Sequence, residues 1–155
     1  MKKMKILLIA FGLTLGIGTL TAQNENVYSN KDNIAVEGYD VVAYFSDYQA
    51  LRGNKSFATQ HEGVTYYFTS QEHLDAFKAN PNKYLPEYGG YCAFAMAKHN
   101  MKVPVDPSDF QITDGKLYLF FNDFYEGTPF NAAIPWVNNQ KDMKKTADAN
   151  WAAMN

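Results

Sequence analysis

The spacing of apolar and polar residues changes several times along the chain, and each pattern predicts a different element. The run VTYYF at 64–68 consists of β-branched and aromatic residues, which is typical of a strand. The run KLYLFF follows Asp114-Gly115, a dipeptide that favours a type I′ turn, so we expect a hairpin over residues 112–121. Residues 34–45 favour extended segments joined by a turn, and the mixed composition of residues 46–60 predicts a loop.

Three other segments have helical spacing. Thr69 precedes Glu72 by three positions, as in a capping box, so we expect a helix over residues 70–79. Small and apolar residues predict a second helix over 91–99, and apolar residues recur at helical intervals over 136–154. Helices and strands in mixed order predict a small single α+β domain, in which a short antiparallel sheet packs with about three helices.

The N-terminal segment is typical of a secretory signal peptide. A lysine-rich start precedes a softened apolar run at 6–20, and small residues lead to a predicted cleavage site near Ala22. We therefore expect a signal peptide at 1–22, a flexible polar segment at 23–33 and the folded domain at 34–154. This organisation predicts an exported protein, periplasmic or secreted, and the alternative is a retained N-terminal anchor.

Composition and charge exclude several classes of protein. Hydrophobic residues make up 46% of the 155 residues and charged residues 19%, which is a globular composition. The formal net charge is −2 and Arg52 is the only arginine, so the sequence argues against nucleic-acid binding. Apolar runs are too short for a clean membrane span, so we expect no stable membrane insertion after signal cleavage. No phosphate loop or dinucleotide motif is present, and no nucleotide cofactor is expected.

The single cysteine, Cys92, lies in the most informative part of the chain. Gly89-Gly90 and Tyr91 precede it, and the predicted helix places it near a helix start, where thiolates are stabilised. Met96 and His99 follow on the same predicted helix face. Thiolate, thioether and imidazole form a soft ligand set that suits Cu(I), so this pattern predicts a copper site.

Other interpretations of these residues stay open. Cysteine and methionine four residues apart are also common in a packed core, and a reactive thiol is a third interpretation of Cys92. His73 fits a helix boundary as well as a metal ligand, and Asp40 fits a turn in which a buried carboxylate needs hydrogen-bond partners. No Ser-His-Asp spacing is recognisable, so the sequence predicts no catalytic residue and favours a non-enzymatic protein.

Three motifs support a family resemblance. Gly38-Tyr39-Asp40, VTYYFTS at 64–70 and PNKYLPEYGGYCAFAMA at 81–97 resemble the YHS domain family. The closest similarity is to its exported, stand-alone branch, which carries Tyr-Gly-Gly-Tyr-Cys-Ala. The resemblance covers residues 34–151.

The resemblance implies a small metal-binding module related to those found beside heavy-metal transporters and sensors. The family pattern of three cysteines falls on Ala43, Thr69 and His73 in this chain, so two of the three positions lack a ligand. Because a structural zinc site needs four ligands, we expect no structural zinc here. Of the three positions, His73 alone retains a side chain that binds metals.

The sequence thus leaves several functional hypotheses. The first is an exported module that binds a soft transition metal, copper above others, through a site centred on Cys92. Its expected partner is a metal donor or acceptor protein. One alternative is a redox protein that uses a single thiol, and another is a domain that binds a small ligand without metal in a tyrosine-lined pocket.

Overall fold

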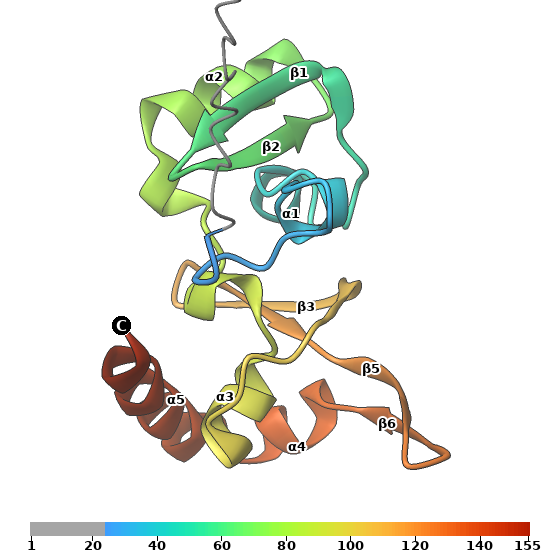
Figure 1. The fold of residues 1–155 in the computed structure, drawn as a ribbon, viewed down its shortest axis with the longest axis vertical. Helices are drawn as coiled ribbons and strands as arrows, with labels where there is room; N and C mark the ends of the chain where they lie inside the picture. Colours follow the sequence, from blue (N-terminus) through green and yellow to red (C-terminus); the bar gives the residue numbers. More distant parts are fainter. Residues whose placement is uncertain (1–23) are drawn as a thin grey trace, which may run out of the picture.

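The computed structural model describes residues 24–155, and the predicted signal peptide at 1–22 lies outside the described residues. Figure 1 shows two halves. The N-terminal part of the chain, coloured blue to green, forms the upper half, and the C-terminal part, coloured yellow to red, forms the lower half. Both halves combine helices with antiparallel strand pairs, which confirms the α+β class. Among residues 24–155, no helix is both long and apolar enough to cross a bilayer.

The N-terminal half is a hairpin packed on a helix, together with an irregular segment that leads into it. Its elements are η1 (Val36–Gly38), α1 (Ala43–Ser46), β1 (Asn54–His61), β2 (Val64–Phe68) and α2 (Gln71–Ala79). Tyr66 of β2 stacks on Phe77 of α2 at 4.9 Å between ring centroids, and both side chains are buried. The predicted strand at 64–68 is therefore confirmed, and it forms the core side of the hairpin.

Two segments in this half have a different secondary structure from the predicted one. Residues 54–61 form strand β1, where a loop was expected. The sequence did not predict this strand because its mostly exposed side chains lack the apolar alternation that marks a strand. Residues 43–46 form helix α1 where an extended segment was expected. Ala43 and Tyr44 are fully buried, so their apolar character was mistaken for that of a strand.

Helix α2 also begins differently from the prediction. Ser70 is its N-cap, and its hydroxyl accepts a hydrogen bond from the backbone N–H of His73 at 3.2 Å. Thr69, which we expected to cap the helix, instead donates its hydroxyl to Asp40. Thr69 and Ser70 both have hydroxyl side chains that suit an N-cap. The sequence did not distinguish them because the hydrogen bond between Thr69 and Asp40 is a tertiary contact.

The C-terminal half contains two hairpins and three helices. After η2 (Pro81–Lys83) and η3 (Glu87–Gly90), its elements are α3 (Ala93–His99), β3 (Asp106–Thr113), β4 (Lys116–Phe120), β5 (Asn122–Tyr125), β6 (Thr128–Asn131), α4 (Ala133–Asn138) and α5 (Gln140–Met154). Asp114 and Gly115 have φ of 53° and 71°, as a type I′ turn requires, so the predicted hairpin is confirmed. The described strands pair as three separate two-stranded sheets instead of one short sheet.

The predicted helix at 136–154 is interrupted. Asn139 has φ −143° and ψ 39°, which ends α4 and lets α5 start in a new direction. Trp136 of α4 is fully buried, whereas α5 buries Met143 and Ala147. The helical spacing of apolar residues continued across the break, and for that reason the sequence pattern did not locate it.

The segment before the domain packs onto the fold. Within 24–33, the stretch we expected to be polar and flexible, Val27 and Tyr28 are buried. The backbone N–H of Tyr28 donates to the carbonyl of Gly89 at 2.8 Å. This hydrogen bond ties the N-terminal segment to the chain that links the two halves.

Candidate functional site

Asp40 is the only polar or charged residue in the buried core of the described chain, and its carboxylate is fully hydrogen-bonded. Its Oδ1 accepts from the backbone N–H groups of Val42 at 2.8 Å and Ala43 at 3.3 Å, which fixes the turn into α1. Its Oδ2 accepts from the backbone N–H and hydroxyl of Thr69, both at 2.8 Å, and lies 2.7 Å from Nδ1 of His73. The Asp40 network therefore joins α1, the end of β2 and α2.

His73 carries this network toward the surface. Since an ionised carboxylate only accepts, Nδ1 of His73 holds the proton toward Asp40. Its Nε2 lies 3.2 Å from Oγ of Ser46 and 3.8 Å from Oδ2 of Asp47. The structure thus brings together two predicted site residues, Asp40 and His73, which the sequence did not place in contact.

The order Ser46–His73–Asp40 is that of a nucleophilic triad, and sequence spacing did not reveal it. However, Oγ of Ser46 also lies 2.8 Å from the carboxylate of Asp47. A negative charge beside the hydroxyl opposes the oxyanion that forms in acyl transfer. We therefore interpret the Asp40 network as a structural clamp.

The three positions onto which the YHS resemblance places cysteines all lie at this clamp. Ala43 offers Asp40 only its backbone N–H, Thr69 donates its hydroxyl to Asp40, and His73 is held by the same carboxylate. A methyl group and a committed hydroxyl do not suit zinc, so the residues present do not fit a structural zinc ion. Hydrogen bonds to Asp40 connect these segments.

Cys92 lies in the other half, at the N-cap of α3, and only 1% of its surface is exposed. Its backbone N–H donates to the carbonyl of Val103 at 3.0 Å, and its Sγ accepts from the N–H of Phe121 at 3.3 Å. Burial raises the pKa of the Cys92 thiol, and hydrogen bonds from backbone N–H groups offset this only in part. The neutral thiol is therefore favoured near pH 7.

Beside Cys92 the structure forms an apolar hollow of about 310 Å³. Helix α3 provides one wall, and the strand ends and the loop around them provide the other. Phe94 of α3 faces Phe130 of β6 at 5.6 Å between ring centroids, and Tyr125 of β5 lies 6.3 Å from Phe130. The remaining lining residues are Cys92, Ala95, Lys98, His99, Val103, Phe121 and Ala132. We call this the Cys92 hollow.

Only two of the three predicted copper ligands on helix α3 line the Cys92 hollow. Cys92 and His99 both line the Cys92 hollow, at opposite ends of α3. Met96 is fully buried and is not among the residues that line this hollow. Among residues 24–155, no group of three or more His, Cys, Asp or Glu side chains is arranged to hold a metal ion.

Gly89, Gly90 and Tyr91, which the sequence associated with Cys92, hold the N-terminal segment in place. A Cβ at Gly89 would lie 1.9 Å from the carbonyl oxygen of Asn26, so only glycine fits there. The hydroxyl of Tyr91 donates to the carbonyl of Glu25 at 3.0 Å.

Gly89 also borders a second cleft, of about 340 Å³, between the two halves.

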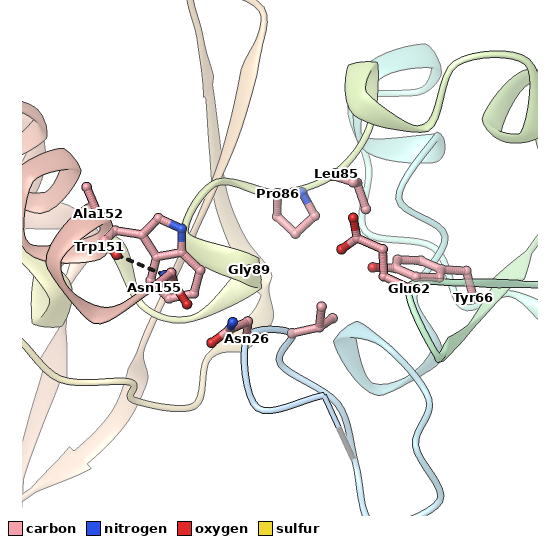
Figure 2. Close-up of a pocket in the computed structure, with 10 residues that line it drawn as sticks. Asn26, Glu62, Tyr66, Leu85, Pro86, Gly89, Trp151, Ala152 and Asn155 are labelled. Atoms are coloured by element: carbon pink, nitrogen blue, oxygen red, sulfur yellow. Dashed lines mark hydrogen bonds between the residues drawn. The ribbon is translucent and has the colours of Figure 1, made fainter. Parts of the chain in front are cut away.

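Figure 2 shows this second cleft, with Trp151 of α5 on one side and Tyr66 of β2 on the other. Pro86 and Asn26 complete its rim. Its walls mix amides, a carboxylate and rings, whereas those of the Cys92 hollow are almost wholly apolar. The Cys92 hollow is thus the better defined site for an apolar ligand.

Comparison of the chain with family models, with curated proteins and with solved structures finds no match. The resemblance to YHS domains therefore stays a prediction from the motifs. The sequence located Cys92 and His99, but it missed Phe130 and Tyr125, which lie on a hairpin that the pattern did not predict. The aromatic residues of the run DFYEGTPF were the only signal for that wall.

Proposed function

We propose that this protein is a binding module whose Cys92 hollow takes a small apolar ligand. The observation that carries the proposal is the hollow itself, whose walls are almost entirely aromatic and aliphatic. Its volume of about 310 Å³ lies at the lower end of the range for small-molecule pockets, roughly 300–1,000 Å³. The proposal makes the protein a carrier or sensor of a small molecule instead of an enzyme.

The position of the hollow suits this function. Helix α3 is fixed by α5, because Nδ2 of Asn150 donates to the carbonyl of Met96 at 2.8 Å. Phe121 is anchored by its backbone hydrogen bond to Cys92 at 3.3 Å. Side chains on fixed elements lose little conformational entropy when a ligand binds, which favours affinity. A ligand here would also cover Phe94 and Phe130, both of which are partly exposed.

The neutral dye N-phenyl-1-naphthylamine, whose fluorescence rises in apolar surroundings, tests this function. Ala95→Phe places a ring in the hollow and should lower the affinity for the dye by more than about tenfold. Ala149→Phe, on an exposed position of α5, is the matched control and should leave the affinity unchanged. Val103→Phe fills the hollow from the opposite wall, in case Ala95→Phe does not fold. If both folded variants bind the dye as the unmodified protein does, the proposed function is wrong.

A soft metal is the second candidate, because Cys92 and His99 border the same hollow. A thiolate and an imidazole suit Cu(I), and an apolar wall would shield the ion from water. A metal donor or acceptor protein would then be the partner. The raised pKa of Cys92 means that binding would have to displace the thiol proton.

Competition with a chromophoric Cu(I) chelator tests this second candidate. Cys92→Ser should abolish binding, and His99→Gln should weaken it. Met96→Leu should have no effect, because Met96 does not line the hollow. Retention of Cu(I) affinity in Cys92→Ser would eliminate this candidate and leave the apolar ligand.

A further inference from the structure

We propose that the ligand of the Cys92 hollow is an amphipathic organic anion. Its apolar body would lie against the aromatic walls, and its single carboxylate or sulfonate group would lie beside Lys98 and His99. This inference rests on the proposed function, because it names the ligand class of the same site.

The charges around the hollow support an anion. Lys98 is the only lysine or arginine in its lining, His99 adds an imidazole beside it, and no aspartate or glutamate lines it. Both are exposed, lie in the last turn of α3 and line the hollow. The whole chain has more acidic than basic residues, so this pairing of an apolar interior with a basic rim departs from the average surface.

Lys98 is free for this purpose because the end of α3 is stabilised by other groups. Lysines in a last helical turn commonly interact with the free carbonyl groups there. Here Nδ2 of Asn150 donates to the carbonyls of Met96 at 2.8 Å and Ala97 at 3.4 Å. Asn100 then ends the helix in the left-handed conformation, with φ 52°.

No ion pair neutralises Lys98 within the part of the chain that the structure describes. Asp142 of α5 lines a neighbouring hollow together with Lys98, but the two side chains are not among the ion pairs of the described residues. The ring of His99 packs at 6.2 Å from that of Phe94, which holds the imidazole next to the aromatic wall. One ammonium and one imidazole suit one anionic head group and do not suit a polyphosphate.

Two dyes that share one ring system separate this inference from the proposed function. The first is 8-anilinonaphthalene-1-sulfonate, and the second is N-phenyl-1-naphthylamine, which lacks the sulfonate. Lys98→Gln should weaken binding of the sulfonate dye by up to about fivefold, since an exposed charge pair contributes little. The neutral dye should keep its affinity. Raising the salt concentration should weaken only the sulfonate dye.

The matched control is Lys78→Gln, because Lys78 is an exposed lysine in the last turn of α2, in the other half. It should change neither affinity. If Lys98→Gln leaves both affinities unchanged while Ala95→Phe lowers both, the hollow binds apolar ligands and the anion inference is wrong. If Ala95→Phe and Val103→Phe lower neither, the proposed function fails and this inference fails with it.

Discussion

Nδ1 of His73 lies 2.7 Å from Oδ2 of Asp40, a carboxylate buried completely in the core 33 residues earlier in the chain. A buried carboxylate is tolerated only when its oxygens are hydrogen-bonded, and Asp40 accepts from backbone, hydroxyl and imidazole groups. This contact joins the turn before α1 to helix α2. Much of the stability of the N-terminal half should therefore depend on Asp40.

Asp40→Ala should lower the free energy of unfolding by about 3–5 kcal/mol, because several buried donors lose their acceptor. Thr69→Val is the matched control. It removes one hydroxyl from the same oxygen and should cost only about 1 kcal/mol. Urea unfolding followed by circular dichroism measures both. Equal losses in the two variants would mean that the Asp40 network is not a clamp.

Gly89→Ala should destabilise the protein by more than about 3 kcal/mol, since its Cβ would overlap the carbonyl of Asn26 and its φ is +63°. Gly63→Ala is a suitable comparison, because Gly63 also has a positive φ, +80°, but has nothing within 4 Å of the added Cβ. Its cost should be about 1–2 kcal/mol, from the backbone alone. Thermal unfolding of the two variants tests whether Gly89 is required for docking of the N-terminal segment.

Buried tyrosines should make the protein sensitive to alkali. Burial raises the pKa of Tyr44, Tyr66 and Tyr88, and it raises the pKa of Tyr118 to about 12 from 10.0. These tyrosines ionise at a lower pH in the unfolded chain than in the folded protein. The free energy of unfolding therefore has its full value below pH 10 and falls as the pH rises from 10 through 12. Tyrosinate absorbance at 295 nm should therefore rise together with unfolding.

Tyr118→Phe provides a sharper version of the same test. The hydroxyl of Tyr118 is buried and has no hydrogen-bond partner among the described residues. Its removal should leave stability at pH 7 unchanged or slightly higher, by up to about 1 kcal/mol. The loss of stability above pH 10 should become less steep. A large loss of stability at pH 7 would contradict this prediction.

Cys92 should react slowly with a disulfide reagent at pH 7, because its buried thiol has a raised pKa and is mostly protonated. The reaction should accelerate as the pH rises above the ordinary thiol value of 9.0, and again when the protein is unfolded at constant pH. Over the same range the folded state should lose stability, since the unfolded thiol ionises first. A fast native reaction at pH 7 would instead support the single-thiol redox alternative.

Export is a separate prediction, which concerns residues outside the described part of the chain. The mature protein should lack residues 1–22, because its basic start, apolar run and small residues are typical of a cleaved signal. Intact mass and N-terminal sequencing of the protein from the native host measure this. A protein that begins at Met1 and sediments with membranes would instead be an anchored one.

Local patterns determined the elements whose conformation depends on neighbouring residues. Asp114-Gly115 determined a type I′ turn because both residues tolerate positive φ, and the run at 64–68 determined a strand because its side chains fit a half-buried pleat. The burial of Leu74 and Phe77 followed from helical spacing alone. The α+β class needed no more than the order of such segments.

Tertiary structure decided where side chains from distant segments meet. Asp40 and His73 are 33 residues apart, and Cys92 accepts from Phe121 across 29 residues, so no local spacing records either contact. The wall of the hollow at Phe130 depends on a hairpin whose strands have little burial pattern of their own. Backbone conformation is encoded within a few residues, whereas a carboxylate clamp or an apolar hollow exists only once separate elements have packed together.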